Sequence, residues 1–339
     1  MHGNPTAREL QRMLFQGTPL PRPLLLPMVF SLGARIENVS LRAFLGNPTK
    51  ITNAMRQLRG PLGADGITCY CDPFLEAEAL GGTLEWKSED GPPELRWPGR
   101  VLPDAIPSGL HVPEEAVKGG RIPVAVEVIR RLKALVRDEL VLTAVITGPF
   151  TLAGRILRID ASQANEMEHL HPAAIELAAE MTTKVSSALV EAGANLLFVR
   201  EETFPQFNPE MCEAWKAALE PAINVMRFYE AVPAVQLGSP ASARQFGAYA
   251  LREFGGAVVC LLPDAWSSLE QEAIAALNPA KVGIAIPSEM YDATVAATRE
   301  PGVTGRWPTP AVITTPGDVS PTTEAKNLAK MLERAAAGN

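Results

Sequence analysis

Carboxylates of this chain gather where short apolar runs end. The run "GITCYC" stops at Asp72, with Glu76 one turn further on, and the run "NLLFVRE" ends in Glu201 and is followed by Glu202. Carboxylates that converge raise one another's pKa, so they can serve as acid and base or bind a cation. Asp72, Glu201 and Glu202 are therefore the candidate catalytic residues. Only one of the adjacent pair is expected to face the site, because neighbours on a strand point to opposite sides.

Other polar residues stand at or just after the ends of apolar runs. The candidate substrate-binding residues taken from these positions are Arg35, Cys71, Glu76, Arg155, Gln236 and Asp318. Some strand-end acids have a plainer explanation. Asp264 precedes a helical pattern and reads as its N-cap, and Asp318 in "PGDVSP" could equally form a turn.

A metal site is the other chemistry that the cysteines could support. Cys69 and Cys71 are two apart on a predicted strand, so their side chains should face the same way and could supply two soft ligands. No histidine lies near a strand end to complete the set. A zinc site would have to combine these cysteines with carboxylates, which is an uncommon set. We therefore expect no bound metal and assign the cysteines to the wall of the fold.

The elements that must position these residues alternate along the chain. Eight apolar, β-branched runs are predicted strands: 24–30, 66–71, 141–147, 195–201, 232–237, 257–262, 282–286 and 311–315. Helices are predicted near 48–60, 150–158, 171–193, 209–230, 242–253, 266–277, 288–298 and 322–337. Continuous apolar strands alternating with helices are typical of a covered parallel sheet, and eight such units favour a closed barrel.

The predicted fold is thus α/β, a single (β/α)8 TIM barrel over residues 1–339. In this fold the carboxyl ends of all strands meet at one mouth, which is where the candidate residues should converge. The pattern is interrupted at 81–123, where two short strand-like runs flank Asp90-Gly91-Pro92-Pro93 and a Pro-rich linker follows. This predicts a β-hairpin insertion after strand two.

Composition excludes several classes of function. The formal net charge of the 339 residues is −7, without a basic stripe for nucleic acid. No apolar run approaches the roughly 20 residues needed to span a bilayer, and the N-terminus lacks a signal-peptide core. Four cysteines are too sparse for a disulfide framework, so we expect a cytoplasmic protein without nucleic-acid or membrane partners.

Four stretches, in order, resemble the uroporphyrinogen decarboxylase superfamily. They are "GADGITCYCDPFLEAEALGG", "ITGPFTLAGRIL", "LVEAGANLLFVREETFPQFNPEMCEAWKAALEP" and "TTPGDVSPTTEAKNLAKML". The resemblance covers the chain from about Pro21 to about Glu333 and implies a (β/α)8 barrel. It also implies one of two chemistries, which are metal-free decarboxylation of uroporphyrinogen and methyl transfer between corrinoid proteins and thiols, usually on zinc.

The decarboxylase motifs are matched only in part. The catalytic Asp of that branch falls on Asp72, and Arg35 can stand for one of its two arginines. Its Asp-Ser pair falls on Glu201 and Glu202, and its C-terminal His is missing near Pro316. The predicted mouth also carries more acids than arginines, which should repel a substrate with eight carboxylates.

The wording "EAEALG" at 76–81 is similar to the thiol methyltransferase branch. The zinc ligands of that branch fall on Gln236, Gly238 and Gly317, which cannot replace a histidine and two cysteines. The resemblance therefore implies a methyltransferase or demethylase that works without zinc.

Together these observations predict an enzyme that moves a methyl group between a small-molecule substrate and a corrinoid or folate carrier. The carrier would be methylcobalamin or tetrahydrofolate, with no tightly bound cofactor, and a corrinoid protein and a second copy of the chain are candidate partners. The alternative is a decarboxylase of uroporphyrinogen or another carboxylic acid. A second alternative is a catalytically silent barrel that acts as a binding subunit.

Overall fold

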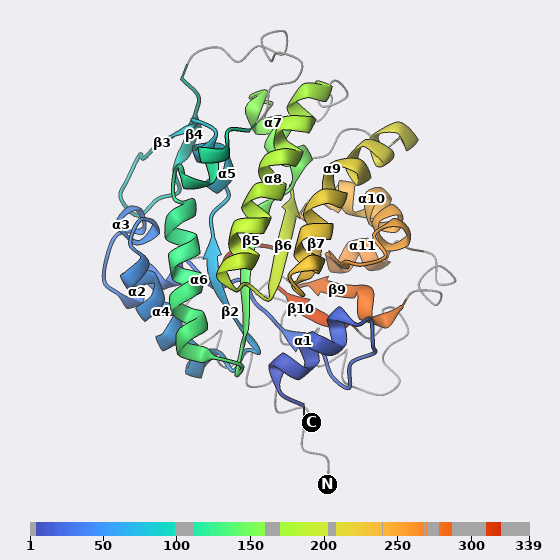
Figure 1. The fold of residues 1–339 in the computed structure, drawn as a ribbon, viewed down its shortest axis with the longest axis horizontal. Coiled ribbons are helices and arrows are strands. Elements are labelled where there is room, and N and C mark those ends of the chain that lie inside the picture. Colours follow the sequence, from blue (N-terminus) through green and yellow to red (C-terminus); the bar gives the residue numbers. More distant parts are fainter. Residues whose placement is uncertain are drawn as a thin grey trace.

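Eight parallel strands form a nearly closed barrel inside a layer of helices (Figure 1). The computed structural model describes residues 5–98, 112–159, 170–202, 208–238, 240–267, 269, 278–286 and 310–319. The strands are β1 (Leu24–Leu25), β2 (Gly66–Cys71), β5 (Val141–Thr147), β6 (Leu196–Glu201), β7 (Val232–Leu237), β8 (Val258–Leu261), β9 (Val282–Ala285) and β10 (Val312–Thr314). They pair in the order β1-β10-β9-β8-β7-β6-β5-β2. Each lies within one of the eight predicted runs, so the barrel prediction is confirmed.

The barrel closes between β1 and β2 without a regular ladder among the described residues. The Asp65 backbone N–H donates to the Leu25 carbonyl at 2.9 Å, and the Leu25 N–H donates to the Asp65 carboxylate at 2.9 Å. Arg22 holds that carboxylate with two hydrogen bonds of 2.7 and 2.8 Å. A charged side chain thus takes the place of backbone pairing at this seam.

Helices cover the outside of the barrel, and the strongest predicted ones are present. The larger helices are α4 (Pro48–Leu62), α6 (Ile122–Val136), α7 (Pro149–Ile156), α8 (Pro172–Ala192), α9 (Pro209–Phe228) and α10 (Pro240–Glu253). The ends of α8 show why it forms there, since the His171 side chain accepts a hydrogen bond at its N-cap and Gly193 takes the left-handed conformation at its C-cap. Shorter helices are α2 (Leu32–Ile36), α3 (Leu41–Leu45), α5 (Leu75–Ala79) and α11 (Pro263–Ser267).

Several predictions fall on other parts of the chain. The predicted helices near 288–298 and at 322–337, and most of the one near 266–277, lie outside the described residues. After β2, strands β3 (Thr83–Glu85) and β4 (Glu94–Arg96) pair antiparallel. Part of the Pro-rich linker, 99–111, is also outside the described residues, and the chain continues with a 3-10 turn at Glu114–Lys118.

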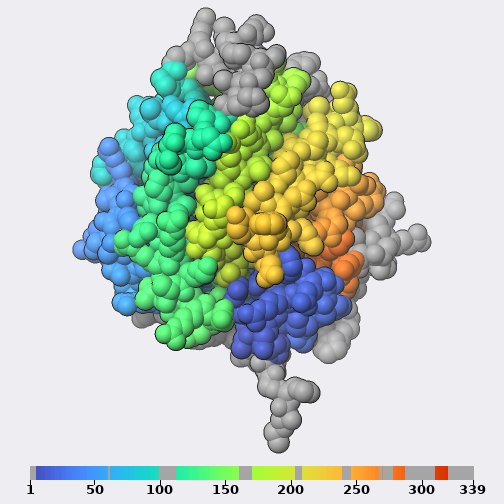
Figure 2. Space-filling view, in the orientation of Figure 1, coloured from blue at the N-terminus to red at the C-terminus, as the bar shows by residue number. Residues whose placement is uncertain are grey.

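Helix α1 (Ala7–Phe15) covers the end of the barrel where the strands begin. It is not among the helices predicted from the sequence. A capping box starts it, because Thr6 accepts from the Glu9 backbone N–H while Glu9 accepts from that of Thr6. Figure 2 shows the α1 residues packed below α8 and α9. Among the described helices, none combines the length and the apolar character that crossing a membrane requires.

Candidate active site

A cavity of about 260 Å³ opens at the carboxyl ends of the strands. Its lining comes from the ends of β2, β5 and β6, from the start of the segment after β2, from α7 and from the segment after β10. The polar and sulfur-bearing side chains that line it belong to Cys71, Asp72, Thr147, Arg155, Arg200, Glu202 and Asp318. Five of the nine residues predicted for the site thus meet here, namely Cys71, Asp72, Arg155, Glu202 and Asp318.

Asp72 is buried at the cavity wall, with a side chain 1% exposed. The Phe74 backbone N–H donates to its Oδ1 at 2.9 Å, and Arg121 Nη1 lies 2.6 Å from its Oδ2. Arg121 is itself held by Glu78, whose Oε2 accepts from Nε at 2.9 Å. Burial raises the pKa of Asp72, while the Arg121 guanidinium opposes that rise. Asp72 is therefore a carboxyl group poised to bind a proton more tightly than an ordinary aspartate.

Arg121 was missed from the sequence, and the reason is its location. It precedes α6, after the interruption that follows β2, and does not stand at the end of a barrel strand. No local motif distinguishes it from other surface arginines. Only the fold brings it behind Asp72.

Glu202 holds two arginines at the mouth. Arg155 Nη2 donates to its Oε2 at 2.7 Å, and Arg200 Nη1 lies 3.0 Å from its Oε1. Arg155 also donates to Thr147 Oγ1 at 3.0 Å, and its guanidinium lies 5.3 Å from the centre of the Phe74 ring. Glu202 is thus the member of the adjacent acidic pair that faces the cavity.

Asp318 ties the C-terminal side of the cavity to the N-terminal side. Its carboxylate accepts from the backbone N–H of Phe30 at 2.8 Å and from that of Ser31 at 3.0 Å. Burial raises the pKa of Asp318 to about 6, although these hydrogen bonds favour the ionised form. The Asp318 carboxylate thus binds backbone N–H groups from the opposite end of the sequence and does not form a local turn with them.

Glu201, predicted as a catalytic residue, does not line the cavity. Its carboxylate is fully buried and accepts from the Phe150 N–H, the Thr151 N–H, the Thr151 hydroxyl and Trp215 Nε1 at 2.6 to 3.1 Å. These donors fix the N-terminus of α7, where a negative charge is favourable. A Cβ at Gly148 would collide with this carboxylate, which explains the glycine in "TGPF".

Three predicted substrate-binding residues also lie off the cavity lining. Glu76 is fully buried, accepts from the Thr147 N–H at 3.0 Å and has its pKa raised by burial to about 7. Gln236 is fully buried and donates to the Thr315 carbonyl at 2.7 Å. Arg35 is exposed on α2. Helix and strand geometry turns these three side chains into the fold or outward, which strand-end position alone does not reveal.

The cysteine pair does not act as one unit. The pairing of β2 with β5 shifts register between Thr68 and Tyr70, so the regular alternation expected for Cys69 and Cys71 is broken by a bulge. Cys71 lines the cavity and Cys69 does not. Burial raises the pKa of the Cys71 thiol well above its usual range, so Cys71 lines the cavity as a neutral thiol.

The positions at which the sequence resemblance implies zinc ligands hold residues that do not fit that metal. Gly238 and Gly317 offer no side-chain ligand, and Gln236 is turned toward Thr315. Within the described ranges, no three His, Cys, Asp or Glu side chains come together in a way that could hold a metal ion.

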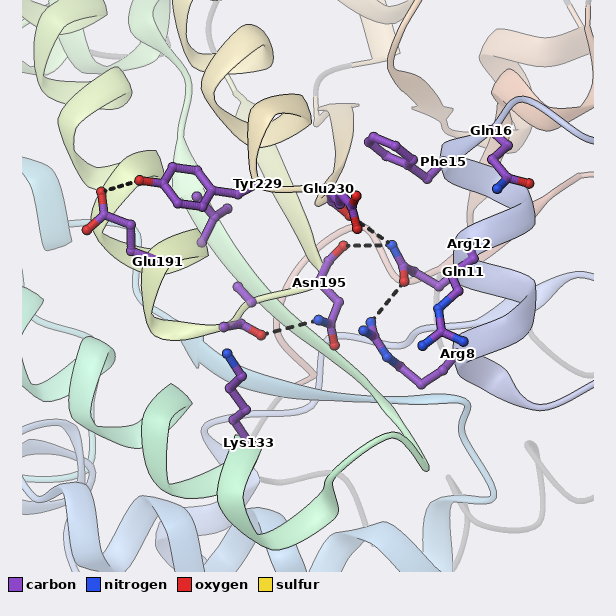
Figure 3. A pocket seen from close by; sticks show the side chains of 13 residues that line it. Arg8, Gln11, Arg12, Phe15, Gln16, Lys133, Glu191, Asn195, Tyr229 and Glu230 are labelled. Atoms are coloured by element: carbon purple, nitrogen blue, oxygen red, sulfur yellow. Dashed lines mark hydrogen bonds between the residues drawn. The ribbon is translucent and has the colours of Figure 1, made fainter.

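A second cavity, of about 460 Å³, lies at the opposite end of the barrel, between α1 and the segments that lead into β6 and β7 (Figure 3). Gln11 Nε2 donates to the backbone carbonyls of Asn195 at 3.4 Å and Glu230 at 3.3 Å, and its Oε1 accepts from Arg8 at 2.9 Å. Asn195 Oδ1 accepts from the Leu142 N–H at 3.0 Å. These central polar groups are bound by the fold itself.

The barrel and its polar cavity at the carboxyl ends of the strands form the layout in which TIM-barrel enzymes carry their active sites. Residues 6–234 match the model of the uroporphyrinogen decarboxylase (URO-D) family. The chain belongs to this family, as its sequence motifs indicated.

Two curated relatives are named as methyltransferases. A Methylated-thiol–coenzyme M methyltransferase of Methanosarcina mazei is 29% identical over 142 residues, which span 41% of this chain and 37% of the relative. Methylcobamide:CoM methyltransferase MtaA of Methanosarcina barkeri is 24% identical over 178 residues, which span 49% of this chain and 51% of the relative. The matched segments thus cover about half or less of these relatives.

A solved structure extends the likeness in fold to nearly the whole chain. A methyltransferase from Methanosarcina mazei superposes with a TM-score of 0.73 at 15% identity and covers 98% of each chain. At this identity the similarity supports the (β/α)8 barrel and nothing finer.

Proposed function

We propose that this protein transfers a methyl group between a small substrate and a corrinoid carrier, without zinc. The names of the two relatives support methyl transfer. The zinc-free form is supported by the residue types at Gln236, Gly238 and Gly317, which are not zinc ligands. The observation that carries the choice over decarboxylation is the cavity itself, which is small and whose described lining residues carry no excess of positive charge.

The cavity lining carries fewer acids than the sequence predicted, but the acids still outnumber the arginines. Asp72, Glu202 and Asp318 line the cavity against Arg155 and Arg200, because Glu76 and Glu201 are turned away. Both arginines already pair with Glu202. An octacarboxylate would require concentrated positive charge to offset its desolvation, and this lining does not supply it.

The size argument points the same way. The cavity has a volume of about 260 Å³. Drug-sized ligands occupy cavities of about 300 to 1,000 Å³. The cavity suits a small substrate better than a tetrapyrrole macrocycle.

In the proposed reaction the carrier supplies an electrophilic methyl group, and the substrate is a nucleophile that bears a proton. The new bond forms between the methyl carbon and the nucleophilic atom as the carrier–methyl bond breaks, and the proton of the nucleophile must leave. Asp72 is the residue placed to accept it, since burial raises its pKa and a base is most effective when its pKa approaches the working pH. Arg121 holds the carboxylate in place from behind.

The experiment is to treat the protein with a chelator and then incubate it with methylcobalamin and a thiol under anaerobic conditions. Loss of the methylcobalamin absorbance together with the methylated thiol is the expected result, with no gain on adding zinc. Activity that depends on added zinc would overturn the zinc-free mechanism.

A parallel incubation with uroporphyrinogen tests the decarboxylase alternative. Coproporphyrinogen formed at about one turnover per second, a typical enzymatic rate, would replace methyl transfer as the conclusion. Inactivity in both assays would favour the binding subunit instead.

A further inference from the structure

Arg200, at the end of β6, holds hydrogen-bond donors that the described part of the fold leaves unused. Its side chain lines the cavity and is 25% exposed. Nη1 lies 3.0 Å from Glu202 Oε1, which is the one pairing that Arg200 makes among the described residues. Nε is buried there without a hydrogen-bond partner, and no hydrogen bond of the described residues involves Nη2.

The acids around the cavity do not supply the missing acceptor. Asp72 is engaged by the Phe74 N–H and Arg121, and Asp318 is engaged by two backbone N–H groups. Glu202 divides its two oxygens between Arg155 and Arg200. After these pairings, the Nη2 side of Arg200 is the cationic donor that is left facing the cavity.

Leaving a buried donor unpaired costs about 1 to 3 kcal/mol, and folded proteins pair nearly all such groups. A guanidinium placed to stabilise the fold would be expected to use more than one of its donors. The unused donors of Arg200 therefore indicate a binding role, in which a ligand contributes the acceptor.

Gly317 keeps the guanidinium accessible. A Cβ at this position would lie 3.0 Å from Arg200 Nη2 and 3.1 Å from Nη1. Any side chain at 317 would therefore press on the guanidinium and shift it.

We propose that Arg200 anchors the small substrate by a carboxylate, with Nη2 donating to a carboxylate oxygen and Gly317 leaving room for it. The substrate is then a small nucleophile that carries one carboxylate, as a mercaptocarboxylic acid does. A planar carboxylate matches the guanidinium fork, and one such group suits a cavity that cannot neutralise many. This inference names the substrate class of the proposed methyl transfer and rests on it.

The test compares binding of three thiols of similar size to the protein without a methyl donor, by calorimetry. Mercaptoacetate carries a carboxylate, 2-mercaptoethanol is neutral and cysteamine is cationic. We expect mercaptoacetate to bind at least 10-fold more tightly than the other two. Arg200→Gln should raise its Kd at least 10-fold and change that of 2-mercaptoethanol less than 2-fold.

Gly317→Ala is the second variant, because it keeps every charge and adds only the Cβ. It should weaken mercaptoacetate at least 3-fold, whereas Arg12→Gln in the opposite cavity should have no effect. Equal binding of the three thiols, or mercaptoacetate binding unchanged in Arg200→Gln, would overturn the inference.

The binding measurements test the carboxylate anchor, and the turnover measurements test the proposed methyl transfer, so either can fail without the other. Selective, Arg200-dependent binding of mercaptoacetate without methyl transfer would leave the carboxylate anchor standing and reject the proposed reaction. Methyl transfer to 2-mercaptoethanol as fast as to mercaptoacetate would reject the anchor and keep the reaction.

Discussion

The two ends of the barrel carry cavities that use their polar groups in opposite ways. The cavity below the strands is the larger, about 460 Å³ against about 260 Å³, yet Gln11 and Asn195 at its centre bind the backbone of neighbouring segments. The cavity at the carboxyl ends holds an arginine with unused donors and a buried aspartate with a raised pKa. Unpaired donors occur at both ends, because Arg8 Nε at the lower cavity is also buried without a hydrogen-bond partner among the described residues. What distinguishes the upper cavity is that an arginine with unused donors and a buried carboxyl group with a raised pKa line the same space.

The same contrast occurs within one strand end. Glu201 and Glu202 are adjacent, but the Glu201 carboxylate accepts hydrogen bonds from the start of α7 and from Trp215. The Glu202 carboxylate pairs with the two arginines of the cavity. Substitutions that separate stability from catalysis can therefore test the comparison directly.

The largest effect is expected at Glu201. Glu201→Ala would remove the buried carboxylate that accepts four hydrogen bonds from Phe150, Thr151 and Trp215, so we expect a loss of about 3 to 5 kcal/mol in the free energy of unfolding. Glu202→Ala, at a partly exposed position, should cost less than about 1 kcal/mol. Urea denaturation of both variants measures the difference, and equal losses would contradict the assignment of Glu201 to the scaffold.

Asp72→Asn should lower kcat/KM for methyl transfer about 100-fold or more, because general-base catalysis contributes about 10² to 10⁴. The matched control is Asp264→Asn, which removes an exposed carboxylate that also follows a barrel strand but lies off the cavity. Its activity should equal that of the wild type. An Asp72→Asn variant with full activity would remove this residue from the mechanism.

Glu76→Gln should flatten the dependence of stability on pH. Burial raises the pKa of Glu76 to about 7, so its contribution to stability is full below the ordinary pKa of about 4.3 and is lost as the pH rises toward 7. A neutral Gln has no proton to lose. The free energy of unfolding should therefore fall about 2 kcal/mol less between pH 5 and pH 8 than in the wild type.

Denaturant titrations at the two pH values measure that difference. The exposed Glu220→Gln serves as control and should keep the wild-type slope. Parallel slopes for Glu76→Gln and the wild type would show that Glu76 is already ionised at pH 5.

The smallest effect is expected at the opposite end. Gln11→Ala removes the two donated bonds of 3.3 and 3.4 Å, so it should cost about 1 kcal/mol of stability. It should leave kcat/KM and the binding of mercaptoacetate unchanged. A fall in either would show that the lower cavity communicates with the site and would weaken the contrast between the two ends.

The barrel was predictable from the sequence because its signal is local. Runs such as 141–147 and 232–237 are continuously apolar, and the helices between them carry their own caps, as at His171 and Gly193. Helix α1 also has a local signal, the capping box of Thr6 and Glu9, but its place on the barrel depends on segments such as 190–195, far along the chain.

The site was predictable only to the level of strand ends. Because Asp72, Glu202 and Asp318 stand at or after strand ends, they could be predicted to lie near one cavity. The direction in which each side chain points depends on tertiary contacts that cannot be read from the sequence. Glu201 turns inward because α7 begins above it. Arg121 joins Asp72 from a distant segment, so no motif could reveal it.

The pairing of β1 with β10 has a consequence for how the chain reaches its final form. Leu24 aligns with Val312, and Asp318 accepts hydrogen bonds from Phe30 and Ser31, so the first strand depends on residues almost 290 positions later. On the ribosome, where synthesis runs from the N-terminus at about 5 to 20 residues per second, β1 must therefore wait for the rest of the barrel. The candidate cavity, which Asp318 helps to line, is completed only after β10 has emerged.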